Sequence, residues 1–234
     1  ELFEQIMSTS RKKQYQLMTE HGIVEKEDFT EVESLDFSNA RIVFQGVEGA
    51  YSQLAMKTYF GENCNGYNVD SWKDAMEDIK CGKADYAVLP IENSSAGIVS
   101  ENYDLLVEYD NYIVGEQIIR IDHSLMGLPG AKLSDIRTVY SHPQALMQCS
   151  DFFDEHKDIN QVAVRNTAFS AKKVKDDGDI TQAGIASHIS ADIYGLQVLE
   201  SRIQNNKNNA TRFIIVSAKR VCRRDADRIS ICFE

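Results

Sequence analysis

The sequence lacks any segment long and apolar enough to cross a membrane. No hydrophobic run approaches the ~20 residues that a spanning helix needs, and no signal peptide is visible. These absences predict a protein without membrane association, located in the cytoplasm.

The few cysteines are not arranged for metal or disulfide chemistry. There are five of them, an odd number, with no CxxC pair and no histidine at zinc-site spacing. Nucleotide-binding loops are missing as well, since neither GxGxxG nor a loop ending in GK[ST] occurs. We therefore expect no metal site, no disulfide framework and no cofactor.

Positive charge is also scarce. The formal net charge is −11, and the basic clusters at 11–13 and 219–220 are short. This balance disfavours a nucleic acid partner, because no Lys/Arg run offsets the acidic excess. An anionic ligand would have to be held locally, by backbone N–H groups and a few placed side chains.

What is present is the composition of an ordinary globular protein, with 43% hydrophobic and 26% charged side chains. A chain of 234 residues can form one or two compact units. Residues 1–21 predict a helix, because apolar side chains recur at spacings of three and four, with Ser10 and Gln14 on the same stripe. Residues 23–40 are acidic without a clear period and predict a linker.

Two series of alternating strands and helices follow, one starting at residues 41–45 and the other at residues 136–140. Such alternation predicts parallel sheets covered by helices. The expected class is therefore α/β, with two βα lobes and a cleft between them at the carboxyl ends of the strands. We expect lobe 1 at about 41–120 plus 200–220 and lobe 2 at about 121–199.

Four polar segments lie where strands end or begin: 46–52 (GVEGAYS), 141–145 (SHPQA), 166–167 (NT) and 208–213 (NNATRF). Each segment alone is explained as well by a turn or a helix cap as by a ligand site. His142 or Ser141, for example, suits a cap in front of Pro143, and no Ser/His/Asp order can be inferred from the histidine. The whole set favours a binding cleft, because strand ends of two lobes would bring these side chains together.

With these motifs the sequence resembles the prephenate dehydratase family over nearly all of residues 41–219. Five family motifs occur in the family's order: GxxG(A/T)(Y/F)S at 46–52, PxENSxxG at 90–97, SHPQA at 141–145, YGL at 194–196 and NxTRF at 209–213. The resemblance implies a fold like the type II periplasmic binding proteins, with a cleft between the lobes. It also implies a lyase of L-phenylalanine biosynthesis that converts prephenate to phenylpyruvate without a cofactor.

The resemblance carries site residues with it. Thr211 is expected to be catalytic, by hydrogen bonding the hydroxyl group that leaves. Arg212 either clamps a substrate carboxylate or pairs with an acidic neighbour that fixes the loop, and Phe213 is expected to pack rather than bind. The expected substrate-binding residues are Ser52, Asn93, Ser94, Ser141, Gln144, Asn166, Thr167, Asn209 and Arg212. Asn205 departs from the family pattern, which has an acidic residue shortly before the final motif.

The flanking segments extend the resemblance. Residues 1–22 resemble the last helix of a chorismate mutase domain, in which Ser10 and Gln14 would line that enzyme's site. Residues 221–234 resemble a linker followed by the first strand of an ACT regulatory domain. The expected parent is a fused mutase, dehydratase and ACT protein regulated by phenylalanine, dimeric at full length and truncated here at both ends.

Two other functions remain open from the sequence. A two-lobed cleft also suits a non-catalytic module that binds a solute or senses an effector. A dehydratase that accepts arogenate would differ from a prephenate dehydratase only in its substrate.

Overall fold

The computed structural model describes residues 9–10, 13–14, 17–18, 21 and 29–228. The helix predicted over residues 1–21 therefore falls largely outside the described residues. Ser10 and Gln14 are helical and exposed, as are Leu17 and Met18 of the apolar stripe. The described residues of this segment are therefore not buried by the rest of the described chain.

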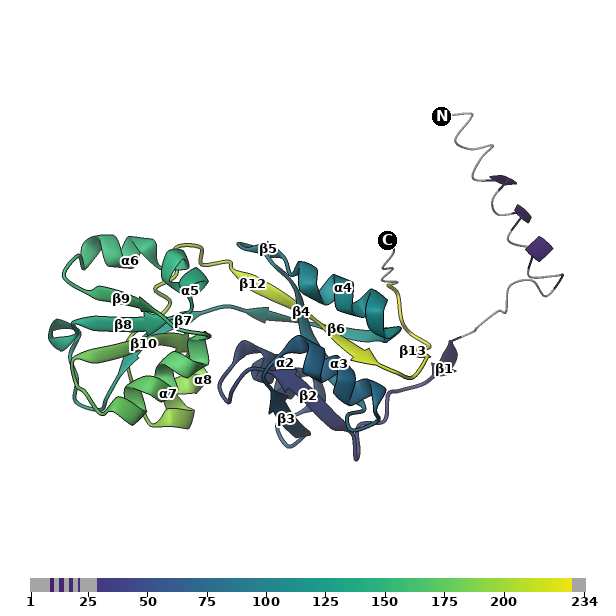
Figure 1. Ribbon diagram of the computed structural model, residues 1–234, viewed down its shortest axis with the longest axis horizontal. Helices are drawn as coiled ribbons and strands as arrows, with labels where there is room; N and C mark the ends of the chain where they lie inside the picture. Colours follow the sequence, from purple (N-terminus) through teal and green to yellow (C-terminus); the bar gives the residue numbers. More distant parts are fainter. Residues whose placement is uncertain (1–8, 11–12, 15–16, 19–20, 22–28, 229–234) are drawn as a thin grey trace.

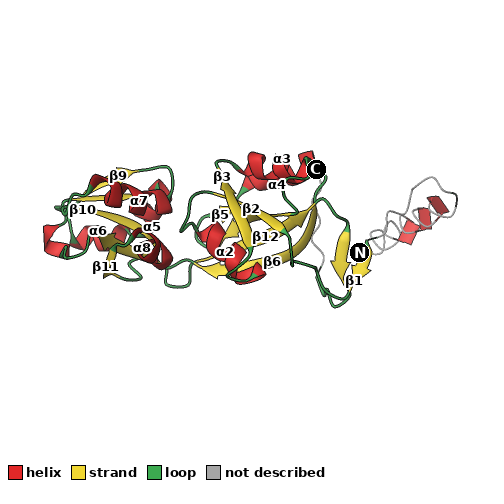
Figure 2. Ribbon diagram, turned by 90° about the horizontal axis from the view of Figure 1, so that it is seen from below, coloured by secondary structure: helices red, strands yellow, loops and turns green. Residues whose placement is uncertain are grey.

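The first lobe is built on a sheet of six strands, ordered β3-β2-β4-β12-β6 with β5 paired to β4. Helices α3 and α4 cover one face and α2 covers the other (Figures 1 and 2). In β2, Val43 packs on the α3 side, whereas Ile42 and Phe44 pack on the α2 side, because successive strand side chains point to opposite faces. The elements are β2 (Arg41–Gln45), α2 (Tyr51–Phe60), β3 (Asn65–Val69), α3 (Trp72–Lys80), β4 (Tyr86–Asn93), β5 (Gly97–Ile98), α4 (Ser100–Tyr109), β6 (Tyr112–Arg120) and β12 (Ala210–Ser217).

The second lobe repeats this plan with a sheet ordered β11-β7-β10-β8-β9. Two buried clusters, one around Leu125 and Ile185 and one around Met126 and Ala186, show that both faces of the sheet are covered. The elements are β7 (His123–Gly127), η1 (Leu133–Asp135), β8 (Thr138–Ser141), α5 (Pro143–Gln148), α6 (Ser150–Glu155), β9 (Asn160–Ala163), α7 (Thr167–Asp177), β10 (Gln182–Ser187), α8 (His188–Tyr194) and β11 (Gln197–Glu200).

The sheets are mixed: the predicted parallel pairing holds for β2 with β3 and β4 and for β8 with β9 and β10, but not for two further strands. Strand β12 runs antiparallel to β4 and β6, and β7 runs antiparallel to β10 and β11. The cause lies in the crossings between the lobes: the chain enters the second lobe directly from β6 into β7 and returns through β12 (Figure 1). Each of these two crossing strands, β7 and β12, lies between the strands that come third and fourth in chain order among the others of its sheet, the short β5 left aside.

Residues 143–155 form two helices, α5 and α6, which are divided at Cys149. Asn205, from the returning chain, supplies competing hydrogen bonds at this point. Its backbone N–H donates to the Gln148 carbonyl at 2.7 Å, and its side-chain oxygen accepts from the Asp151 N–H at 3.3 Å. An amide oxygen is sufficient for this cap, so the expected carboxylate at position 205 is not needed for it.

A short parallel pair, β1 (Thr30–Val32) with β13 (Val221–Arg223), lies beyond the first lobe (Figure 1). Both strands fall in segments that the sequence pattern described only as linkers. The strand predicted at residues 229–233 lies outside the described residues.

The lobes also touch through the turn that precedes α2. The Gly49 carbonyl accepts hydrogen bonds from the hydroxyls of Ser187 at 2.8 Å and Ser190 at 3.0 Å, and the Tyr194 hydroxyl donates to the Glu48 carbonyl. Gly49 has a φ of +85°, and a Cβ placed there would lie 2.6 Å from the Ser190 Oγ. Of the two possibilities for residues 46–49, a structural turn is therefore the one that these contacts support.

We expect Gly49→Ala to destabilise the protein more than Gly61→Ala does. Both glycines have positive φ, but a Cβ at Gly61 meets nothing within 4 Å. Each substitution should cost about 1–3 kcal/mol of backbone strain, and Gly49→Ala should also disturb the contact with Ser190. Urea unfolding of the two variants measures the difference. Equal losses of stability would contradict a role for this turn in joining the lobes.

Candidate functional site

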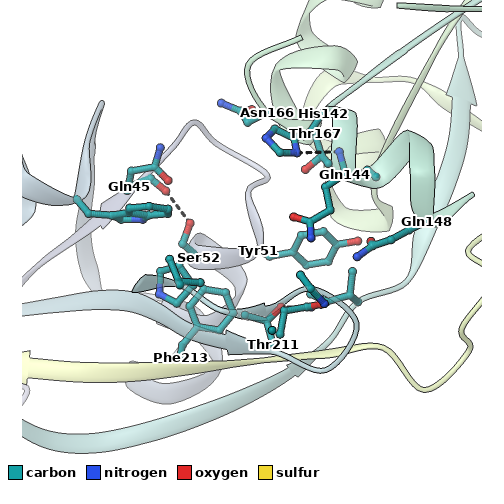
Figure 3. Close-up of a pocket in the computed structure, with 18 of the residues that line it drawn as sticks. Gln45, Tyr51, Ser52, His142, Gln144, Gln148, Asn166, Thr167, Thr211 and Phe213 are labelled. Carbon is teal, nitrogen blue, oxygen red and sulfur yellow. Dashed lines mark hydrogen bonds between the residues drawn. The ribbon is translucent and has the colours of Figure 1, made fainter. Parts of the chain in front are cut away.

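A cavity of about 580 Å³ lies between the lobes. The first lobe contributes the start of α2, the end of β4, the β5 segment and the start of β12. The second lobe contributes the N-terminal ends of α5 and α7 (Figure 3). Six of the expected site residues line the cavity: Ser52, Asn93, Gln144, Asn166, Thr167 and Thr211.

Thr211 is buried at the start of β12, and its hydroxyl meets the side chain of Asn93. Asn93 ends β4, and β12 pairs with β4 so that these two residues are in register. The Asn93 Nδ2 donates to the Thr211 Oγ1 at 2.9 Å. Because the hydroxyl oxygen is thus an acceptor from Asn93, its proton is directed elsewhere. Within residues 29–228 no acceptor for that proton is found, so it is available to a ligand in the cavity.

The orientation of the Asn93 amide is set by the backbone. Its Oδ1 accepts from the N–H groups of Ser95 and Ala96, both at 2.9 Å. Backbone N–H groups can only donate, so Nδ2 must face Thr211 and Asn209. The Asn209 Oδ1 accepts from it at 2.8 Å, which ties the two family motifs at 90–97 and 209–213 together.

Four expected binding residues do not line the cavity. The Ser141 hydroxyl is fully buried and donates to the Ile185 carbonyl at 2.7 Å. Asn209 is buried beneath Asn93, and the exposed Ser94 lies beside it, with its Oγ accepting from the Ala210 N–H at 3.0 Å. In this structure these three residues support the site instead of facing a ligand.

Arg212 is the fourth. It lies 3.5 Å from Glu116 and 3.9 Å from Glu92, so of its two expected roles the structure favours the pairing with acidic neighbours. The reason is the alternation along β12. Thr211 and Phe213 both border the cavity, and Arg212 between them does not.

On the second lobe, two helices begin at the cavity. His142 caps α5, with its Nδ1 accepting from the Gln144 N–H at 3.2 Å and Pro143 at the first helical position, as predicted. Asn166 caps α7, with its Oδ1 accepting from the Phe169 N–H at 2.7 Å. Free N–H groups in the first turn of a helix attract anions, and of the two helices α7 is the one that offers them, because α5 starts with Pro143 and its Gln144 N–H is already bonded. This wall of the cavity therefore suits a carboxylate.

The charged side chains at the cavity are few. Among the described lining residues Arg165 is the only lysine or arginine and Glu101 is the only acid. The Arg165 guanidinium lies 4.6 Å from the centre of the Phe169 ring. The described residues hold no group of three or more His, Cys, Asp and Glu side chains able to bind a metal.

Tyr51, His123 and Gln148 are among the lining residues that the sequence pattern did not single out. Gln148 could have been found, because it lies four residues after Gln144 and so on the same face of a helix. Tyr51 lies inside the motif at 46–52. His123 starts a strand that was not predicted, and nothing in its local sequence marks it.

The two histidines of the cavity should make stability depend on pH. Burial lowers the pKa of both His123 and His142 below the usual 6.5. As pH falls, the histidines of the unfolded chain therefore take up protons before those of the folded protein do. The free energy of unfolding is highest above pH 6.5 and decreases as pH falls from there through the folded pKa values. We expect urea midpoints to drop between about pH 7.5 and 5.5. The double variant His123→Gln/His142→Asn, which keeps a capping residue, should drop less; an equal drop would contradict this origin.

No helix in the described part of the chain is long and apolar enough to span a bilayer.

Comparisons with known proteins agree on one family. A family model described as prephenate dehydratase matches residues 42–221. The chain is 41% identical over 182 residues to an arogenate dehydratase/prephenate dehydratase of Arabidopsis thaliana, covering 78% of this chain and 46% of the relative. It is 34% identical over 223 residues to a bifunctional chorismate mutase/prephenate dehydratase of Escherichia coli, covering 94% and 55%. The chain thus spans about half the length of these curated relatives.

Solved structures share the fold. The prephenate dehydratase of Arthrobacter aurescens in complex with L-Phe matches with a TM-score of 0.71 and 31% identity, over 76% of this chain and 60% of that chain. A protein described as a novel type of quorum quenching acylase matches with a TM-score of 0.69 and 33% identity, over 81% and 66%. The two-lobed α/β fold expected from the sequence is confirmed.

Proposed function

Since the chain belongs to the prephenate dehydratase family, we propose that its cleft converts prephenate to phenylpyruvate. Prephenate is a cyclohexadiene with a ring hydroxyl at one end and, at the opposite ring carbon, a carboxylate and a pyruvyl side chain. The carbon–carbon bond to the ring carboxylate breaks and releases carbon dioxide. Its electron pair moves into the ring, the carbon–oxygen bond to the hydroxyl breaks, and one proton from solvent completes a water molecule.

The observation that carries this proposal is the Thr211 hydroxyl. Its oxygen accepts from Asn93 at 2.9 Å, so its proton faces the cavity and can hydrogen bond the hydroxyl that leaves. A threonine hydroxyl is too weak an acid to protonate the leaving group outright. Its contribution is an oriented hydrogen bond to developing negative charge, which in a dry site is worth about 10²- to 10³-fold in rate.

The two carboxylates of prephenate need different surroundings. We place the side-chain carboxylate at the N-terminal end of α7, near Arg165. The ring carboxylate must lose its charge as it departs. The apolar lining from Trp72, Ile121 and Phe213 favours that loss, because a low-dielectric wall disfavours a charged carboxylate relative to neutral carbon dioxide.

Gln148 is a further binding residue in this proposal. Its Oε1 contacts His123 and Asn209, and its Nε2 has no partner among residues 29–228. The amide N–H groups are therefore free to donate to an oxygen of the substrate.

A second substrate deserves a test because of Glu101. Arogenate carries an ammonium group where prephenate has its keto oxygen, and a carboxylate at the cavity wall could bind that ammonium. Several relatives are described as accepting arogenate.

An acylase reaction is less well supported. Acyl transfer to a serine needs a base that takes the hydroxyl proton, but the Ser52 hydroxyl donates to the Gln45 carbonyl at 2.6 Å. Within the described chain, the Thr211 hydroxyl also has no histidine as a partner.

The deciding experiment gives the chain prephenate and arogenate separately and follows phenylpyruvate and phenylalanine. We expect turnover of prephenate, with a lower kcat/KM for arogenate. Binding of prephenate without any product would favour a non-catalytic solute-binding module and overturn the proposal.

Two of the relatives are named as bifunctional chorismate mutase/prephenate dehydratases. We propose that residues 1–22 and 221–234 belong to the neighbouring mutase and ACT units. Phenylalanine should then leave turnover by this chain unchanged while inhibiting the longer protein, and ultracentrifugation of the longer protein should show a dimer. A cytoplasmic location remains an expectation that cell fractionation can check.

A further inference from the structure

His123 lies where the chain crosses between the lobes, and only 2% of it is exposed. Its Nε2 is 3.0 Å from the Gln148 Oε1, and its Nδ1 is 3.2 Å from the Tyr51 hydroxyl. The backbone is held as well, since its N–H donates to the Gln204 Oε1 at 3.0 Å. Both ring nitrogens of the imidazole therefore lie within hydrogen-bonding distance of a partner, although the proposed reaction does not use His123.

The hydrogen bonds around His123 decide which nitrogen carries its proton. Asn93 presents Nδ2 to Asn209, because its own Oδ1 is occupied by two backbone N–H groups. Asn209 therefore accepts through Oδ1, at 2.8 Å, and must turn Nδ2 toward Gln148. Gln148 consequently presents Oε1 on this side, 3.3 Å from the Asn209 Nδ2.

The same Gln148 oxygen faces the His123 Nε2, so that nitrogen must be a donor. Burial lowers the pKa of His123 below the usual 6.5, so above that pH the ring is neutral and Nδ1 is an unprotonated acceptor. The Tyr51 hydroxyl has a single proton, for which the Asp122 carbonyl at 2.8 Å and the His123 Nδ1 at 3.2 Å are competing acceptors. The lone pair of His123 is thus directed at Tyr51, away from the cavity, and the ring is not placed to act as a general base.

We infer that His123 is a positioning residue: as its Nε2–H tautomer it holds the Gln148 amide so that the NH₂ group faces the cleft. With Asn209 it provides two donors to a single oxygen, which makes the reversed amide unfavourable (Figure 3 shows Tyr51 and Gln148 at the cleft). A reversed amide would turn its oxygen toward a substrate with two negative charges. The functional consequence rests on the proposed function, whereas the tautomer does not.

The kinetic test uses the chain and prephenate. His123→Leu removes the donor, and we expect kcat/KM to fall about 10- to 100-fold. The melting temperature in the presence of product should stay unchanged, which would show that the cleft still forms. His123→Gln restores a donor and should recover most of the loss. In the Gln148→Met background, where no amide remains to be oriented, His123→Leu should have no further effect. Losses that multiply in the double variant would overturn the inference.

A second measurement does not depend on turnover. Nitrogen-15 NMR of the His123 ring should show the proton on Nε2 in the wild type. A proton on Nδ1 in the neutral ring would overturn the inference even if the kinetic losses occur. If the wild type fails to convert prephenate, the proposed function fails while the NMR result still decides the tautomer.

Discussion

Replacing Thr211 with valine is expected to lower kcat for prephenate by about 10²- to 10³-fold while the protein remains folded. Valine has nearly the shape of threonine and suits the strand, so only the hydroxyl is removed. The Asn93 Nδ2 keeps two acceptors, the Asn209 Oδ1 at 2.8 Å and the Ala210 carbonyl at 3.2 Å. The loss of stability should therefore stay near 1 kcal/mol. Steady-state kinetics and urea unfolding measure the two effects separately.

The matched control is Thr211→Ser, which keeps the hydroxyl and loses only a methyl group. It should retain most of the wild-type kcat. If the valine variant turned over within about threefold of the wild type, the hydrogen bond from Thr211 would contribute less than 1 kcal/mol to catalysis, and the proposed catalytic role would fail.

Replacing Asn93 with aspartate should be about as damaging, with an expected loss in kcat/KM of about 10²-fold. One carboxylate oxygen can still accept from Ser95 and Ala96, but the other would face the Thr211 hydroxyl and the Asn209 Oδ1. The Thr211 proton would then turn toward the carboxylate and away from the substrate. The new charge would also repel a dianionic substrate.

Asn208→Asp separates these causes, because it adds the same charge at an exposed position one residue before Asn209. It should change kcat/KM for prephenate by less than about threefold, since exposed charges are screened by salt. Equal losses in the two variants would mean that repulsion alone explains the effect. The hydroxyl orientation proposed for Thr211 would then lose its support.

Several site residues could be expected from the sequence because their signal is local. Asn166 and His142 stand in front of helices with capping chemistry, and Asn93 and Thr211 stand at the ends of apolar strands. The carboxyl ends of neighbouring strands and the starts of the following helices meet at one edge of a sheet. Local pattern was therefore enough for Asn166 and His142, whereas Asn93 came from the family resemblance and Thr211 reaches this edge because β12 runs antiparallel to β4.

Other features depended on partners far away in the chain. The hydrogen bonds from Asn93 reach residues 116 to 118 positions later, and Tyr51 meets His123 across 72 positions. No periodicity in a short window encodes such a pairing. The direction of Arg212 is similar, because its acidic neighbours lie on β4 and β6, which flank β12.

The sequence by itself determined the α/β class, the two βα series and the motifs that mark the family, because hydrophobic periodicity and turn chemistry act over a few residues. Only the tertiary structure decided that β7 and β12 run against their neighbours, and that Ser141 and Asn209 support the cavity without lining it. It also decided how the proton of Thr211 is directed. A hydroxyl has one proton and several possible acceptors, and the choice among them is made by the amide of Asn93, which two backbone N–H groups hold in place.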